Sequence, residues 1–263
     1  LDLRTSKICR ELDGKIFSMK DRKAGKNYPP MHPWCRSTTI SVIDEDELRN
    51  MKRRAYNPKT GRTETVPANM TYDQWYKKYV KGNAQAEAEE KSVQNAASDK
   101  KQYERYREIL GKDAPKRFAD FQEMKYNDTE KWRFTKLDYQ RRNELLQHPE
   151  LKLPNAENAM AEDAKFEKNL FGGSHQEGLA KGDAFSSRLG YDAENWNSLK
   201  KQIIARAPQY PALSKGVNGY GKHMYEQKII LYGLKGTPAN VVVGWSADNK
   251  SVTMASAYIK EVK

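Results

Sequence analysis

The sequence predicts an α+β fold, in which a helical N-terminal and middle region precedes a small domain of two helices packed on an antiparallel sheet. Two observations carry this prediction. Apolar side chains recur at helical spacing between residues 101 and 160. In residues 161–263, two helical segments come before three strand-like segments, an order typical of α+β domains. Hydrophobic residues make up only 37% of the chain, so we also expect some linker or exposed helix.

The first hundred residues divide into a compact start and a linker. Residues 1–43 are rich in turn residues and end in a strand-like segment over 37–43. Residues 44–100 have little to bury, and we predict a linker with helices there. The elements expected in it are an acidic helix cap, a turn, a helix and an Ala/Glu/Gln-rich segment, at 44–47, 57–61, 72–81 and 83–97.

Residues 101–160 are predicted to be helical in two or three pieces. Tyr103, Tyr106 and Leu110 keep the i, i+3, i+4 spacing of one helix face. After Pro115 the pattern resumes at Phe118, and it continues to the paired leucines at 145 and 146.

Residues 161–263 change character and hold the predicted α+β domain. We expect helices over 161–170 and 195–206, the second with an apolar stripe that includes Leu199 and Ile203. Strands are expected over 224–231, 241–245 and 251–259. The segments between these strands contain Gly, Pro, Asp and Asn, which suit antiparallel hairpins.

Bulk properties exclude several classes of protein. No apolar run approaches the ~18 residues of a membrane span, so an integral membrane protein is excluded. Two cysteines in 263 residues exclude a disulfide scaffold. The chain begins at Leu1 without an initiator Met or a signal-peptide core, so we expect a fragment of a longer protein. A net charge of +12 favours polyanionic partners, but it is spread along the whole chain and is a weak indication.

Cys9, His32 and Cys35 are the possible ligands of a soft metal. A tetrahedral zinc site has four ligands, and Ser6 stands where a Cys-x-x-Cys pair would have supplied the fourth. The sequence therefore favours two buried thiols and a structural histidine, with zinc as the alternative.

The spacing of these residues resembles the end of the Mu F-like (MuF) phage head morphogenesis domain. That family reads Asp-x-Arg-Thr-Cys-x-x-Cys, an Asp-Gly turn, then Pro-Pro-x-His-Pro-x-Cys-Arg. The matching segments here are Asp2–Cys9, Asp13-Gly14 and Pro29–Arg36, with Ser6 in place of the first Cys. The resemblance implies a minor capsid protein packaged in the virion near the portal, with portal and capsid proteins as partners. Many members carry a C-terminal effector domain, which makes them phage-encoded polymorphic toxins.

The last hundred residues resemble the phage branch of the barnase–EndoU–colicin–RelE (BECR) nucleases. The residues that carry this resemblance are Lys181–Phe185, Leu189–Tyr191, Asn195-Trp196, Leu199, Gly221–Glu226, Gly233, Val243–Trp245 and Ser256–Ile259. The resemblance implies an RNA substrate, tRNA above all, cleaved by attack of its own 2′-hydroxyl without a metal or another cofactor. Residues 161–263 would then be a BECR-like toxin domain acting in the bacterial cytoplasm.

Such cleavage needs a base, an acid and cations near the phosphate. Among the four histidines, only His175 and His223 fall in the predicted catalytic domain. His175 follows a Gly-rich loop, Lys181 matches the family pattern, and Tyr225 shares one strand face with His223. We take these four residues as catalytic candidates; a packed histidine and solvated charges are the alternative interpretation.

Strict alternation on the last strand puts Thr253, Ala255 and Ala257 on one face and Ser256 on the other. Related sequences carry Thr or Ser near the position of Ala255. If a catalytic hydroxyl belongs there, this chain lacks it, and Thr253 or Ser256 is the remaining candidate.

A ribonuclease toxin is therefore the leading functional hypothesis, with a cognate immunity protein, acidic on its contact face, as an expected partner. The first alternative is a structural virion protein whose extra domain binds nucleic acid or capsid partners without catalysis. Another toxin chemistry, such as ADP-ribosyl transfer, lacks a recognisable motif. No phosphate-binding Gly-rich loop, serine-hydrolase elbow or zincin motif is present.

Overall fold

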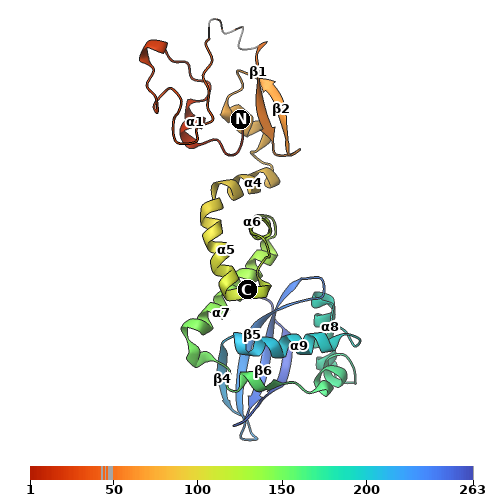
Figure 1. The fold of residues 1–263 in the computed structure, drawn as a ribbon. Helices are drawn as coiled ribbons and strands as arrows, with labels where there is room; N and C mark the ends of the chain where they lie inside the picture. The colour runs from red at the N-terminus through yellow and green to blue at the C-terminus, as the bar shows by residue number, and fades with distance from the viewer. Residues whose placement is uncertain (43, 45, 47–49, 263) are drawn as a thin grey trace. The chain divides into compact units, whose positions relative to one another are not determined.

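The computed structural model describes residues 1–42, 44, 46 and 50–262. They form two compact units, Leu1–Lys101 and Gln102–Lys263, and the boundary falls inside helix α5 (Ala96–Leu110). Both units contain helices and strands (Figure 1), so the predicted α+β class is confirmed. None of the helices in this described part of the chain is long and apolar enough to cross a membrane.

A β-hairpin and two helices supply the core of the first unit. Its elements in order are α1 (Lys7–Leu12), the 3-10 turn η1 (Met19–Asp21), β1 (Lys52–Asn57), β2 (Arg62–Pro67), α3 (Tyr72–Tyr79) and α4 (Ala84–Gln94). The turn predicted at 57–61 joins the antiparallel strands β1 and β2. Trp75 of α3 is fully buried, and its Nε1–H donates to the carbonyl of Tyr56 at 2.8 Å. The stretch 44–100 is thus more than the predicted linker: it contains an unpredicted hairpin and most of the unit's buried side chains.

The strand predicted over 37–43 is not present in residues 37–42, which have no regular secondary structure. The side chains of residues 37–41 are exposed, and no partner strand pairs with this segment in the described residues. A strand without a ladder or a buried face has nothing to stabilise it. Residue 43 and the acidic positions 45 and 47 lie outside the described residues.

The helices predicted between residues 101 and 160 are confirmed as α5, α6 (Phe118–Asn127) and α7 (Thr129–Gln147). The 3-10 turn η2 (Gly111–Asp113) separates the first two. Aromatic rings pack the three helices together, with Tyr106 of α5 stacked on Tyr139 of α7 at a centroid distance of 4.2 Å. Phe121 of α6 is fully buried in the same cluster.

A five-stranded sheet forms the centre of the second unit, in the order β3-β7-β6-β5-β4. The strands are β3 (Ala159–Met160), β4 (Ala212–Val217), β5 (His223–Tyr232), β6 (Pro238–Ala247) and β7 (Val252–Ile259). The three predicted strands are confirmed as β5, β6 and β7, and they are antiparallel to one another. β3 and β4 were not predicted. The short β3 runs parallel to β7, so the sheet is mixed rather than purely antiparallel.

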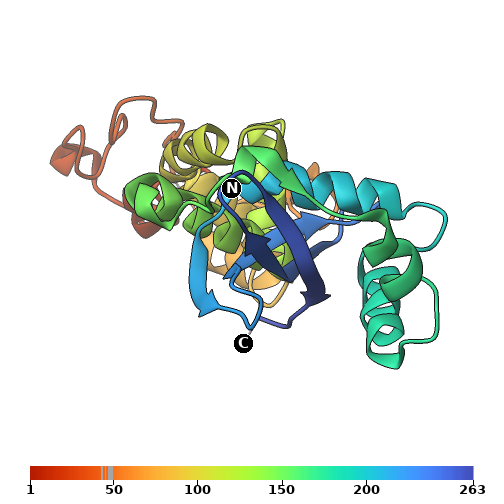
Figure 2. The same ribbon diagram turned by 90° about the horizontal axis from the view of Figure 1, so that it is seen from below.

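The helices of this part differ from those predicted. Helix α9 (Trp196–Arg206) confirms the second prediction, whereas the first is reduced to a π-helical turn, η5 (Lys165–Leu170). The sequence missed α8 (Gln176–Leu189), which begins directly after the Gly-rich loop that contains His175. Figure 2 shows α8 and η5 side by side. The remaining 3-10 turns are η3 (Pro149–Leu151), η4 (Ala156–Asn158) and η6 (Ala207–Gln209).

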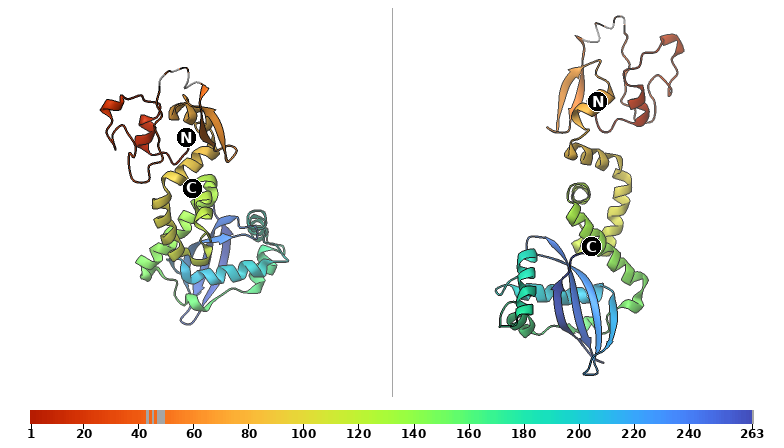
Figure 3. Two further views of the ribbon diagram at one scale, coloured as in Figure 1. Left: turned by 45° about the horizontal axis from the view of Figure 1, so that its top comes forward. Right: turned by 180° about the vertical axis from the view of Figure 1, so that it is seen from behind.

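The two faces of the sheet are covered differently. One face carries Val241, Val243 and Trp245 and packs against the apolar sides of α8 and α9, and α9 crosses it in Figure 1. The right panel of Figure 3 turns the opposite face toward the viewer. There, Arg141 of α7 donates to the carbonyl of Lys228 at 3.1 Å and to Asn240 Oδ1 at 2.8 Å. The middle helices therefore belong to the same compact unit as the sheet.

Candidate functional site

The N-terminus of α8 is fixed by His175, which serves as the N-cap. Its Nδ1 accepts a hydrogen bond from the backbone N–H of Gly178 at 3.3 Å. In the neutral ring that makes this bond, the proton is therefore on Nε2. The imidazole is exposed. His175 thus combines a capping role with a free N–H donor.

Two glycines bring α8 into contact with the π-helical turn. A Cβ on Gly178 would lie 2.0 Å from the carbonyl oxygen of Asn169, and one on Gly182 would lie 1.7 Å from that of Leu170. No side chain fits at either distance, so only glycine permits this backbone approach. Gly182 in the Lys-Gly pair at 181–182 is therefore explained by packing. The same close packing holds Lys181 beside η5.

A β-bulge in β7 determines where its hydroxyls point. Ser256 pairs with Gly244 and Met254 pairs with Trp245, so Ala255 is the additional residue. The bulge places Thr253 and Ser256 on one face and Met254 and Ala257 on the buried face, contrary to the predicted alternation. The Ser256 hydroxyl lies directly over Gly244, where a Cβ would be 2.8 Å from Oγ.

These elements enclose a pocket of about 230 Å³. Its lining includes Lys165, Asn169, His175, Lys181, Ala255 and Ser256. The structure therefore brings together three of the predicted catalytic residues: His175, Lys181 and Ser256. Lys165 is a second cation in the lining that the sequence did not single out.

The other predicted residues lie elsewhere on the sheet. His223 and Tyr225 are in β5, separated from β7 by β6. His223 is exposed and pairs with Ala247, whereas Tyr225 is half-buried and packs on the main core. Thr253 is half-buried in β7, paired with Ser246. None of the three lines the pocket.

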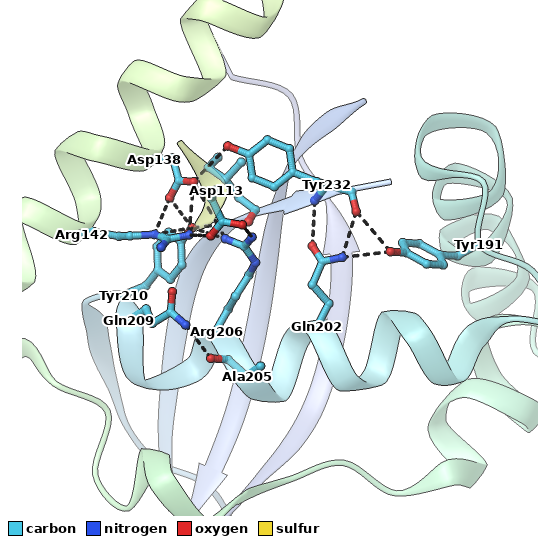
Figure 4. A network of polar contacts seen from close by, with 11 residues as sticks. Asp113, Asp138, Arg142, Tyr191, Gln202, Ala205, Arg206, Gln209, Tyr210 and Tyr232 are labelled. Atoms are coloured by element: carbon cyan, nitrogen blue, oxygen red, sulfur yellow. Dashed lines mark hydrogen bonds and ion pairs between the residues drawn. The ribbon is translucent and has the colours of Figure 1, made fainter. Parts of the chain in front are cut away.

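A buried network of charges connects α7, η2 and α9 (Figure 4). Asp138 is fully buried and accepts from Arg142 at 2.8 Å, from Tyr232 at 3.1 Å and from Tyr210. Asp113 accepts from Arg142 and from Arg206, each at 2.7 Å.

The negative charges of the two carboxylates in this network are balanced by the positive charges of its two guanidinium groups. Burial, and then the Asp138 carboxylate, raise the pKa of both Tyr210 and Tyr232, so their hydroxyls remain neutral donors. The sequence missed this network because its charges sit in mixed-charge helices that are typical of solvated surfaces.

The predicted metal ligands of the first unit also come together. The ligand atoms of Cys9, His32 and Cys35 lie within 4.8 Å of one another. Ser6 Oγ is 2.9 Å from His32 Nε2. Backbone hydrogen bonds at Met31 and Ser37 lower the pKa of the Cys35 thiol to about 6. The favoured interpretation of two buried thiols holds for Cys9 alone, since Cys35 is half-buried.

Comparisons with known proteins identify both ends of the chain. Residues 1–40 match the family described as Phage Mu protein F like protein, which confirms the MuF-like region and supports a phage association. Residues 152–261 match a domain family of unknown function, DUF6883. This second match begins just before β3, in keeping with the place of Leu153 and Ala156 in the core of the sheet unit. No curated protein and no solved structure matched the chain.

Proposed function

We propose that this chain is the effector end of a phage-encoded MuF-type toxin and that its sheet unit cleaves RNA without a metal. The observation that carries the proposal is the pocket between η5, α8 and β7, whose lining includes His175, Lys181 and Ser256. The match of residues 1–40 to Phage Mu protein F like proteins supports delivery with a virion. The fold of the second unit, helices over an antiparallel core of β5, β6 and β7, is of the kind that the BECR resemblance implies.

The pocket holds the groups that a phosphodiester requires. Lys165 and Lys181 supply positive charge, and Nε2–H of His175 can donate to a phosphate oxygen. Ser256 also lines the pocket, with its hydroxyl over Gly244. Fixed donors and cations of this kind stabilise the charge that develops on phosphorus substituents during 2′-hydroxyl attack.

His175 is the imidazole of this pocket and the proposed proton carrier. To take the 2′-hydroxyl proton at Nε2, the ring must carry its own proton on Nδ1 and give up the bond from Gly178. That bond is long at 3.3 Å, so its loss costs little. The proposed order is therefore substrate binding, release of the cap bond and then proton transfer, with the imidazolium returning the proton to the leaving 5′-oxygen.

The test incubates purified protein with tRNA and rRNA in EDTA and follows cleavage on a denaturing gel. We expect cleavage by the wild-type chain and a loss of at least about 100-fold in His175→Ala, the size typical of a proton-transfer residue. His148→Ala is the matched control, because His148 is exposed at the end of α7 and contacts Glu150. Intact RNA at high protein concentration would contradict the proposal.

His223→Ala and Ala255→Thr refine the site. If the pocket is catalytic, His223→Ala keeps most of the activity, because His223 does not line it. Ala255→Thr places a hydroxyl on the bulge residue inside the pocket, and faster RNA cleavage than by the wild-type chain would assign a catalytic role to that position. If His223→Ala loses activity and His175→Ala keeps full activity, the active site lies at β5 and not in the pocket.

The match to a phage head protein family also favours a second function, a structural virion protein whose second unit binds nucleic acid or capsid partners. That function predicts salt-sensitive binding to RNA or DNA without cleavage and no toxicity on cytoplasmic expression. The toxin proposal instead entails tRNA or another RNA as substrate, an immunity protein in the producer and action in the bacterial cytoplasm.

A further inference from the structure

Four polar side chains from two separate segments meet near the N-terminus of the chain. Ser6 caps helix α1 and Cys9 lies in its first turn, while His32 and Cys35 belong to the loop that follows the two prolines. Cys9 Sγ is 3.4 Å from His32 Nε2 and 3.9 Å from Cys35 Sγ. More than twenty residues separate the two segments in sequence, so the tertiary fold, not local geometry, makes this cluster.

Two of the three distances between ligand atoms match the edges of a tetrahedron around a metal ion, and all three ligand atoms lie within 4.8 Å of one another. With Zn–S near 2.3 Å and Zn–N near 2.0–2.1 Å, tetrahedral geometry places two sulfurs roughly 3.8 Å apart and a sulfur and a nitrogen roughly 3.5 Å apart. The observed separations are 3.9 Å and 3.4 Å. A disulfide, by comparison, brings its sulfurs to about 2.05 Å. The cluster therefore has the spacing of a zinc centre rather than that of a cross-link.

The orientation of His32 supports the same assignment. Its Nδ1 lies 2.7 Å from the carbonyl oxygen of Pro33, which can only accept a hydrogen bond. Nδ1 therefore carries the proton, and the lone pair of Nε2 points at Cys9 and Ser6. A backbone carbonyl that fixes the tautomer of a histidine in this way is typical of zinc-binding histidines.

The segment that contains the cluster has little apolar core of its own and is otherwise held by polar contacts such as those of Asp13 with Arg53 and of Arg10 with Glu90. Among the described residues of 1–42, only Leu3 and Cys9 are buried, and α1 and η1 together cover nine residues. So small a buried core does not stabilise a fold of this length unaided, and metal ligation is one of the usual substitutes. An ion bound here would tie α1 to the loop at residues 29–36.

We propose that Cys9, His32 and Cys35 bind one Zn²⁺ ion and that its fourth position is taken by an oxygen ligand held at Ser6. Ser6 Oγ lies 2.9 Å from His32 Nε2, close to the place of the missing fourth corner. A site with two thiolates, one imidazole and one exchangeable oxygen is open to small ligands at that corner. The site belongs to the first unit and is independent of the proposed ribonuclease pocket, which lies entirely in residues 165–257.

The test measures metal content and thiol state of the full chain purified without chelator. We expect one zinc per chain by mass spectrometry of the metal, two free thiols in the denatured protein, and a sulfur-to-metal charge-transfer band after replacement by Co²⁺. Cys35→Ser should lose the band and most of the zinc. A wild-type chain without zinc, or one whose mass shows a Cys9–Cys35 disulfide after purification in air, would overturn the proposal.

The Ser6→Cys variant adds a ligand, so it tests the proposal even if variants that remove a ligand, such as Cys35→Ser, fail to fold. A third thiolate at the fourth corner should tighten zinc binding at least about tenfold, because thiolate is the better zinc ligand, and should strengthen the Co²⁺ charge-transfer band. Ser18→Cys is the matched control: it also adds a thiol at a helix N-cap, outside the cluster, and it should change neither quantity. Equal affinities in Ser6→Cys and wild type would contradict the placement of Ser6 at the fourth corner.

Discussion

Asp138 is the residue on which the buried polar contacts of the second unit converge. Its carboxylate is fully buried and satisfies Arg142, Tyr210 and Tyr232 together. Truncating one member of such a cluster leaves the others desolvated and without a counter-charge, which costs more than the cluster contributes over an apolar equivalent. The loss of stability on removing Asp138 is therefore expected to come mainly from the buried partners left without it.

We expect Asp138→Ala to lower the free energy of unfolding of the second unit by about 3–5 kcal/mol. Asp120→Ala is the control, since Asp120 pairs with Arg117 on the surface at the start of α6, where solvent screens the pair and its loss should change stability little. Urea unfolding monitored by circular dichroism measures both. Equal losses in the two variants would mean that the network is dispensable. Asp138→Asn, which keeps an acceptor oxygen, should lose less than Asp138→Ala.

At the scale of elements, two glycines position α8, because the absence of a side chain lets the helix pack closely. Gly178 and Gly182 lower its intrinsic helix stability, yet they allow its backbone to touch that of η5. This contact places His175 and Lys181 beside the bulge of β7. The helix is therefore weak by propensity and fixed by packing.

Gly182→Ala tests that packing. Alanine is the better helix former by about 1 kcal/mol, but its Cβ would collide with the carbonyl of Leu170, and forced overpacking costs about 1–3 kcal/mol. We expect lower thermal stability and weaker RNA cleavage together, because α8 must shift away from η5 and would move Lys181 with it. Gly219→Ala is the control, since a Cβ there meets open space; a loss of stability as large as that of Gly182→Ala would refute the packing argument.

At the scale of the whole molecule, the described chain consists of two units, and the second contains more than the predicted C-terminal domain. Helices α6 and α7 fall within Gln102–Lys263, and the network of Asp113, Asp138 and Arg142 joins η2 and α7 to α9 and the sheet. A fragment that begins near residue 155 would leave Arg206, Tyr210 and Tyr232 without Asp113, Asp138 and Arg142.

We therefore expect residues 102–263 to fold as a cooperative unit when expressed alone, whereas residues 155–263 should be poorly soluble or melt at a much lower temperature. Differential scanning calorimetry and the dispersion of amide signals in a proton–nitrogen NMR spectrum compare the two fragments. A shorter fragment as stable as the longer one would show that the middle helices are a separable spacer.

Sequence patterns predicted elements best where apolar periodicity was strong. The strands β5, β6 and β7 and the helix α9 carry such patterns, and each was found within a few residues of its predicted bounds. The edge strand β4 was missed because all its residues but Ala212 are exposed. The hairpin of β1 and β2 was missed for a similar reason, since only Ala55, Asn57 and Val66 among its residues are buried.

The sequence by itself determined the α+β class and the MuF-like start, and it supplied six catalytic candidates: His175, Lys181, His223, Tyr225, Thr253 and Ser256. These follow from local periodicity and from spaced motifs, which are properties of neighbouring residues. Only the tertiary structure decided which candidates share a pocket, because that depended on a bulge at Ala255 and on glycine contacts between α8 and η5. It likewise decided that Ser6, Cys9, His32 and Cys35 meet and that Asp138 is buried. Strand register, close backbone packing and the burial of charges depend on segments that are far apart in the sequence. The pattern of neighbouring residues therefore does not predict them.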